Sequence, residues 1–232
     1  MENTQNEEQQ QDQLEVVENT LGRTEQFIED NQKNLLIGLT VVILVILSVW
    51  AYFKYIKGPK EVRAASQMYQ AEAYFEIDSI GLALNGDANY PGFLQIIDQF
   101  SGTKAANNAH YYAGACYMRL GEFEKAIKML DAFDSNDPNL EPVAKGLTGD
   151  AYMELGQTAK AIDMYKKASE KAEGNTFVAP IYLQKLATAY EKEQKFAEAL
   201  KAYETILQNY PSSSEGIKAE KNIAAMKIKL GK

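Results

Sequence analysis

Gly114-Ala-Cys-Tyr-Met-Arg-Leu-Gly-Glu-Phe-Glu-Lys-Ala126 is one of three related stretches in the second half of this sequence. Residues 149–161 and 187–199 are the other two. Each stretch has a small residue, a Tyr three residues later, and an Ala nine residues after the Tyr. The Tyr residues follow one another after 35 and then 38 residues, so a unit of about this length repeats. Small residues at two fixed places let two helices approach closely, and the pattern predicts antiparallel helix pairs.

The three units resemble the tetratricopeptide family, whose repeat of about 34 residues is a pair of helices. In this register the repeats begin at residues 107, 142 and 180, and Tyr117, Tyr152 and Tyr190 occupy position 11. Gly or Ala occupies positions 8 and 20, and Gly121 and Gly156 supply the turn between the two helices. The resemblance implies a superhelix of stacked helix pairs over residues 107–213.

The concave face of such a superhelix commonly binds an extended peptide or a helix. Its lining comes from positions 2, 5, 6, 9, 12 and 13 of each first helix. The predicted partner-binding groove therefore consists of Asn108, Tyr111, Tyr112, Met118, Arg119, Leu147, Asp150, Met153, Glu154, Gln184, Lys185, Thr188 and Glu191. Tyr, Met and Arg are enriched at interfaces, but Tyr111, Tyr112 and Met118 fit packing against neighbouring helices equally well. The Lys and Asn residues with which the family clamps a C-terminal carboxylate are mostly missing, apart from Asn108 and Lys185.

Two further segments flank the repeats. Residues 57–106 are predicted to form a degenerate first repeat, with helices at 61–77 and 91–100 and a turn-rich connection at 81–87. Residues 214–232 are predicted to form a C-terminal capping helix with Lys on its exposed face.

The run of residues 35–53 has no charge, and 13 of its 19 residues are Leu, Ile, Val or Phe. As an α-helix it is about 28 Å long, close to the roughly 30 Å of a bilayer's hydrocarbon core. Trp50, Tyr52 and Tyr55 cluster at its end, where aromatic rings prefer the headgroup level. No small-residue cleavage site follows. We therefore predict a retained transmembrane helix at 35–56, and an all-α fold in which it precedes the tetratricopeptide-repeat superhelix.

Residues 1–34 form an acidic tail with nine acids against Arg23 and Lys33. Residues 2–13 are predicted to be disordered, and Leu14, Val17, Leu21 and Ile28 follow the spacing of a short amphipathic helix. Basic residues are more frequent after the apolar run than before it, which by charge counting places the repeats in the cytoplasm. The bias is two charges, so the orientation stays open on this basis.

The composition excludes several kinds of chemistry. The net charge of −8 provides no basic face for nucleic acid. His110 is the only histidine and Cys116 the only cysteine, and the repeat register assigns both to packing. No Gly-rich phosphate-binding loop precedes a helix. We predict a protein that is not an enzyme and that has no metal, cofactor or small-molecule substrate.

The junction Phe27-Ile-Glu-Asp-Asn-Gln-Lys-Asn-Leu-Leu-Ile-Gly38 resembles the entry to the membrane anchor in the YfgM family, and Ala65-Ser-Gln-Met-Tyr-Gln70 is similar too. The order of acidic tail, single span and irregular repeats also matches. The resemblance implies a bacterial inner-membrane protein that associates with the Sec translocon and with a periplasmic chaperone of the prolyl-isomerase class. It implies a cytoplasmic N-terminus and periplasmic repeats that also contact secreted polypeptides.

These observations predict a single-pass, membrane-anchored scaffold for protein–protein interactions, acting as an ancillary subunit of the Sec translocon. An organiser of cell-wall or outer-membrane assembly that uses the same repeats is the alternative.

Overall fold

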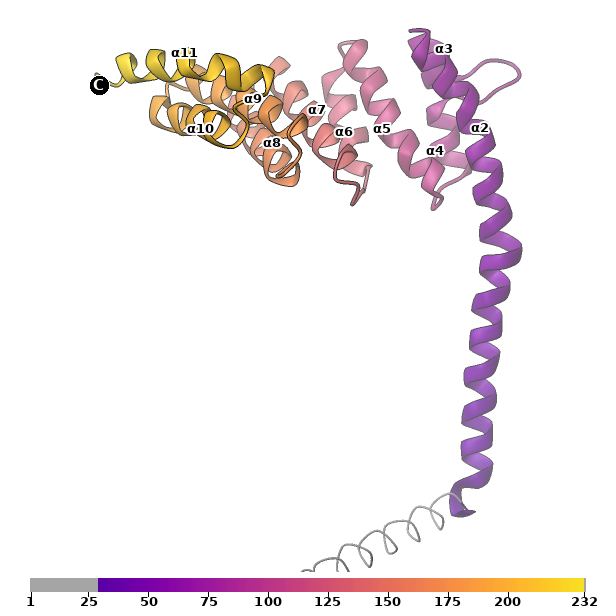
Figure 1. Ribbon diagram of the computed structural model, residues 1–232. Helices are drawn as coiled ribbons and strands as arrows, with labels where there is room; N and C mark the ends of the chain where they lie inside the picture. The colour runs from indigo at the N-terminus through magenta and orange to yellow at the C-terminus, as the bar shows by residue number, and fades with distance from the viewer. Residues whose placement is uncertain (1–28, 232) are drawn as a thin grey trace, which may run out of the picture. The chain divides into compact units, whose positions relative to one another are not determined.

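The computed structural model describes residues 29–231, and their regular elements are helices (Figure 1). The disordered segment and the amphipathic helix predicted before residue 29 lie outside the described residues. The chain divides into two compact units, Met1–Pro59 and Lys60–Lys232. The elements after the apolar run are η1 (Phe53–Lys57), α2 (Gly58–Glu76), α3 (Ile80–Asn85), α4 (Phe93–Gln99), α5 (Lys104–Arg119), α6 (Phe123–Ala132), α7 (Leu140–Glu154), α8 (Thr158–Lys171), α9 (Val178–Lys192), α10 (Phe196–Asn209) and α11 (Ser214–Lys229). The predicted all-α fold is confirmed.

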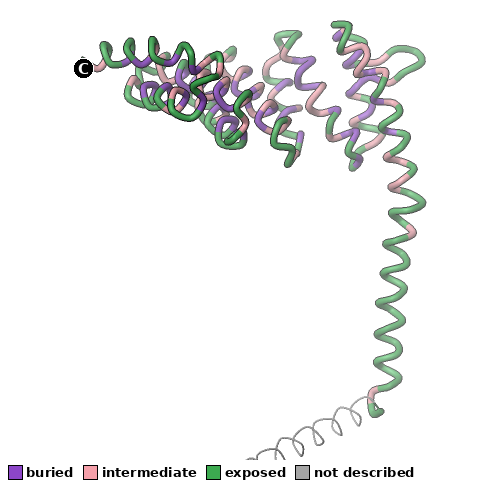
Figure 2. Tube along the Cα trace, viewed as in Figure 1, coloured by how far each residue is buried: buried purple, intermediate pink, exposed green. Residues whose placement is uncertain are grey.

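The first unit contains the apolar run, which lies within a single helix, Glu29–Glu76. No residue in its most apolar stretch is buried (Figure 2). Exposed Leu, Ile and Val side chains over this length are unfavourable in water and favour an apolar environment. The helix is therefore long and apolar enough to cross a membrane.

Aromatic and basic side chains gather where the apolar run ends, around the π-helical turn η1. Trp50 and Tyr55 meet edge to face with their ring centroids 6.2 Å apart, and Lys54 Nζ lies 4.7 Å from the centre of the Trp50 ring. Such a combination is typical of a helix end at the headgroup level, where rings and Lys stems lie in the interface.

The second unit begins with the C-terminal part of α2, which buries Ala64, Met68 and Ala71. These residues recur every three or four positions and so lie on one face of the helix. The Glu61 carboxylate accepts a hydrogen bond from the backbone N–H of Lys104 at 2.8 Å and thereby caps the start of α5.

The segment predicted as a turn-rich connection, residues 81–87, is in part the short helix α3. Ile80, Ala83 and Leu84 are buried at the i, i+3, i+4 spacing of a helical face, so their packing outweighs the Gly and Asn residues around them. The first compact group of this unit is thus three helices, α2 to α4, instead of the expected pair.

Helices α5 to α10 form three antiparallel pairs that follow one another along the chain (Figure 1). The first and second helices of each pair are joined by the same turn. Its central residue has a positive φ, 74° at Gly121, 70° at Gly156 and 58° at Gln194. In each turn the next residue's N–H donates to the carbonyl of the position-11 Tyr at 2.8 to 2.9 Å. The third turn therefore has the geometry of a glycine turn without the glycine.

Small residues allow the two helices of a repeat to touch. A Cβ on Gly114 would lie 2.6 Å from Leu130 Cγ, and a Cβ on Gly149 would lie 2.6 Å from Tyr165 Cε1. Their counterpart in the third repeat, Ala187, is fully buried. The inner helix faces are accordingly the buried ones (Figure 2).

The last helix, α11, begins at a capped N-terminus, where the Ser213 hydroxyl accepts from the backbone N–H of Gly216 at 2.9 Å. It packs Ala219, Ile223 and Met226 against the third repeat, and its Lys residues are exposed. It therefore covers the open apolar end of the repeat stack.

Candidate functional site

A concave pocket of about 470 Å³ lies among the first helices of the three repeats. Its lining residues come from α5, α7, α8 and α9. They are Met118, Asp150, Met153, Glu154, Tyr165, Gln184, Lys185 and Thr188. Seven of these eight belong to the groove predicted from the sequence, so the structure brings together in one hollow residues that the repeat register had placed on one face.

Asp150 is the centre of the polar part of this pocket. Its carboxylate accepts a hydrogen bond from the Tyr165 hydroxyl at 2.7 Å. Lys185 Nζ lies within hydrogen-bond distance of both carboxylate oxygens, at 2.8 and 2.7 Å. Burial, and secondly the bond to Asp150, raises the pKa of Tyr165 far above its usual range, so the hydroxyl remains a donor. The three groups join both helices of the second repeat to the first helix of the third.

The same arrangement recurs one repeat later around Glu191. There the Tyr203 hydroxyl donates to Glu191 Oε1 at 2.7 Å, and Lys229 Nζ of α11 donates to Oε2 at 3.2 Å. Burial, followed by the bond to Glu191, raises the pKa of Tyr203 to about 12. In each of two successive repeats, a carboxylate of the first helix is thus bonded both by a Tyr of the second helix and by a Lys of the helix that follows.

Arg119, also predicted to line the groove, makes its contacts toward the N-terminal side of the second unit. Its guanidinium Nη1 lies 2.9 Å from Asp78 Oδ1, and its Cζ lies 4.1 Å from the centre of the Phe75 ring. Arg119 is therefore paired and stacked, and it does not line the pocket.

The Tyr pair on α5 packs mainly against other rings. Tyr112 stacks on Phe93 with centroids 5.1 Å apart and meets Phe75 edge to face, while Tyr111 lies against Phe133 at 5.6 Å. Both are half-buried, and neither lines the pocket. Of the two readings open from the sequence, these contacts correspond to packing.

The three other predicted groove residues, Asn108, Leu147 and Glu191, also lie outside the pocket. Leu147 packs in a small cluster with Leu130 and Phe133, and Asn108 is exposed. Its neighbour Asn107 makes the structural contacts at this place, with two hydrogen bonds to the Asp134 backbone.

The two residues most often found in catalytic sites are placed in packing positions. Cys116 is fully buried, and burial raises the pKa of its thiol to about 12, so the reactive thiolate is suppressed. His110 is half-buried, and burial lowers its pKa. Among the described residues, 29–231, no three His, Cys, Asp or Glu side chains converge on a possible metal site.

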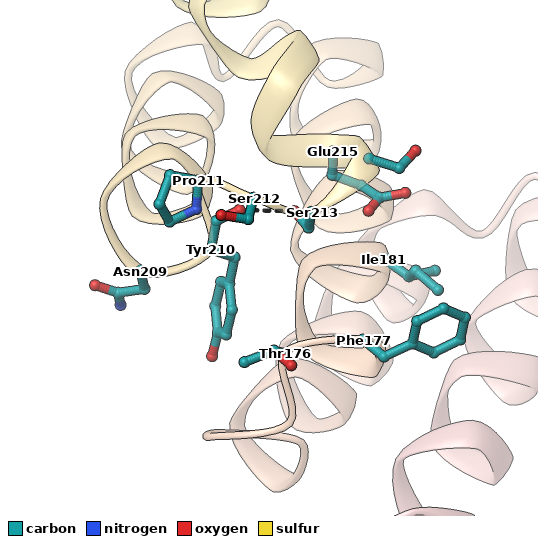
Figure 3. Close-up of a pocket in the computed structure, with 10 residues that line it drawn as sticks. Thr176, Phe177, Ile181, Asn209, Tyr210, Pro211, Ser212, Ser213 and Glu215 are labelled. Carbon is teal, nitrogen blue, oxygen red and sulfur yellow. Dashed lines mark hydrogen bonds between the residues drawn. The ribbon is translucent and has the colours of Figure 1, made fainter.

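A second hollow, of about 610 Å³, lies outside the predicted groove, between the start of α9 and the connection from α10 to α11. Figure 3 shows Thr176, Phe177 and Ile181 on one side and residues 209–215 on the other. Phe177 is 77% exposed there. No motif in the sequence pointed to this hollow, because two segments whose residues are 28 to 39 positions apart create it.

Tyr165 is the pocket residue that sequence reasoning missed. It occupies position 24 of the second repeat, where the resemblance to the tetratricopeptide family implies an aromatic that packs between the two helices. Its ring does pack, and its hydroxyl reaches the groove through Asp150. The signal that could have found it is an acid, Asp150, on the first helix of the same repeat, which faces the Tyr at position 24.

Three segments of the sequence match models described as tetratricopeptide repeat. One model matches residues 108–139 and 182–213, and a second matches residues 146–170. The comparisons indicate no catalytic family. A search of curated proteins finds no match.

Solved structures are similar to this chain in fold. A crystal structure of MamA protein has a TM-score of 0.57 at 18% identity and covers 72% of this chain and 82% of its own. A putative kinesin light chain of Podosopora anserina, with nearly identical TPR-like repeats, has a TM-score of 0.54 at 13% identity and covers 73% of this chain and 87% of its own. At these identities the likeness concerns the fold. The chain thus contains three segments that match tetratricopeptide repeats, in helix pairs that share the fold of these solved structures, and an N-terminal helix long and apolar enough to cross a membrane.

Proposed function

We propose that this protein is a membrane-anchored scaffold that holds segments of other proteins in the pocket between Met118 and Thr188, as an ancillary subunit of the Sec translocon. In this proposal the apolar helix anchors the chain in a bacterial inner membrane, and the repeats lie in the periplasm beside a chaperone that acts on secreted proteins. Tetratricopeptide repeats indicate an interaction scaffold in general.

One observation carries the scaffold proposal. Seven predicted groove residues, which come from the first helices of all three repeats, line a single hollow. Within it, Met118 and Met153 lie beside charged and amide groups. Methionine side chains adapt to varied apolar partners, which suits a surface that receives different segments. The junction at residues 27–38, similar to the YfgM family, supports the placement at the translocon.

Site-specific photocrosslinking in living cells tests the partner. A photoreactive amino acid at Thr188 lies in the pocket and is exposed, so it is tolerated there better than at half-buried Tyr112. The same amino acid at Lys201, exposed on α10 and outside the pocket, is the matched control. We expect Thr188 alone to capture translocon subunits, a periplasmic chaperone or secreted chains. Capture of cell-wall synthases instead would favour the envelope organiser, and capture of cytoplasmic proteins alone would exclude both.

Topology is tested independently with a reporter fused after Lys232 that is active only in the periplasm. We expect activity in intact cells. An inactive periplasmic reporter together with an active cytoplasmic one at the same place would contradict the proposed orientation, and with it the translocon role.

A further inference from the structure

Three cations on or beside the predicted groove are paired with acids of the chain itself. Lys185 is paired with Asp150 at 2.7 Å, Arg119 with Asp78 at 2.9 Å, and Lys229 with Glu191 at 3.2 Å. In each pair the cation belongs to a later helix than the acid, so the pairs form as repeats stack. A carboxylate ligand would therefore have to compete with a neighbouring acid for any of them.

The pocket has an acid left over. Its lining contains two carboxylates, Asp150 and Glu154, and one cation, Lys185. Among the described residues, 29–231, Glu154 has no partner in an ion pair, and its side chain is exposed. The local field of the pocket consequently favours a positive ligand group.

The same pocket is partly apolar. Met118 and Met153 are half-buried and lie among the residues of two hydrophobic clusters, so each has an exposed part that faces the pocket. A ligand that covers these thioethers removes apolar surface from water. On the α9 side, the Thr188 hydroxyl donates to the Gln184 carbonyl at 3.0 Å, so its oxygen can still accept a hydrogen bond from a backbone N–H of a ligand.

Building on the scaffold function proposed above, we propose that the pocket binds polypeptide segments in which a Lys or Arg is flanked by large apolar side chains. The cation lies against Glu154, and the apolar neighbours cover Met118 and Met153. The chain's own acidic tail, with nine acids and two basic residues in positions 1–34, has the opposite charge and is not the occupant. The occupant is a second protein.

The test uses the full chain in zwitterionic detergent micelles and two fluorescent synthetic peptides. Both contain the same Leu and Ser residues, one with Lys and the other with Glu at the remaining positions, and each has a photoreactive group. Anisotropy measures affinity, and mass spectrometry locates the crosslink. We expect the Lys peptide to bind at least about tenfold more tightly than the Glu peptide and to label the segment around Met153. Glu154→Gln should weaken the Lys peptide about fivefold, and added salt should have a similar effect.

Glu204→Gln is the control, since Glu204 is exposed on α10 outside the pocket, and it should leave both affinities unchanged. Glu154→Lys should raise the affinity of the Glu peptide above that of the Lys peptide. Equal binding of both peptides, or a Lys-peptide affinity that Glu154→Gln leaves unchanged, would overturn the inference while the groove remains a binding site. Capture of neither peptide at the pocket would overturn both the inference and the scaffold function on which it rests.

Discussion

Gly146 lies where the second and third repeats meet, and we predict that Gly146→Ala destabilises this contact. A Cβ at this position would lie 1.9 Å from Tyr182 Cε1 and 2.3 Å from Cζ. Ordinary contact begins near 3.4 Å, so the ring or the helix must move by about 1.5 Å. The ring is not free to swing away, because Tyr182 is only 7% exposed and packs with Tyr165 and Leu186.

Two effects of opposite sign decide the magnitude. Overpacking of a closed core costs about 1–3 kcal/mol, and a displacement of this size belongs at the upper end. Replacing Gly by Ala within a helix returns about 1 kcal/mol of helix propensity. The expected net loss is about 2 kcal/mol. Gly81→Ala on α3 is the matched control, because its Cβ would meet nothing within 4 Å, and only the propensity gain of at most about 1 kcal/mol remains.

Amide hydrogen exchange of the full chain in detergent, read by mass spectrometry, measures this loss locally. About 2 kcal/mol corresponds to roughly 30-fold faster exchange in α7 and α9, while α3 and α4 change little because repeats couple to their neighbours. The double variant with Tyr182→Leu should recover about 1 kcal/mol relative to the sum of the single changes. Exchange in Gly146→Ala that is as slow as in the parent chain would refute the reasoning, since the Tyr182 contact would then not be tight.

Three further outcomes follow from single residues. Gln194→Gly should raise stability by about 1 kcal/mol in thermal unfolding, because a residue with φ 58° gains from losing its Cβ; an unchanged midpoint would contradict this. His110→Gln should flatten the pH dependence of stability. Burial lowers the pKa of His110 in the folded chain, so the unfolded chain takes up the proton first as the pH falls. The parent chain therefore loses stability below about pH 6.5, and the variant should not show this loss. Cys116, with a thiol pKa raised to about 12, should react with iodoacetamide at pH 8 only after unfolding, and rapid labelling of the folded chain would disprove its burial.

The parts of the fold that sequence predicts well are those governed by local spacing. A small residue, a Tyr and an Ala at fixed separations define the three helix pairs, and the structure places Ala126, Ala161 and Ala199 fully buried. The uncharged run at 35–53 is equally local. The helix α3 was missed because its buried face is only three residues long and lies in a run rich in Gly and Asn, where local propensity indicates a turn.

The candidate site shows where local spacing stops being informative. The register predicts which residues share the concave face, since that depends on the helix period alone. It does not predict that Lys185 meets an acid 35 positions earlier, or that Arg119 reaches back to Asp78, because these contacts depend on the angle at which successive repeats stack. The same angle decides that Tyr112 packs on Phe93.

The repeated Tyr–carboxylate–Lys arrangement links stacking to ligand choice. Pairs as exposed as Lys185 and Asp150, at 37% and 28%, contribute at most about 1 kcal/mol to stability. Their larger effect is on the charge presented to a ligand, because each cation that joins two repeats is no longer available to an acidic partner. Removing Lys185 should therefore cost little stability and make the pocket more acidic, which strengthens binding of a basic segment. A chain that needed to bind acidic tails would have to break these pairs first, and so the stacking contacts themselves act against that class of ligand.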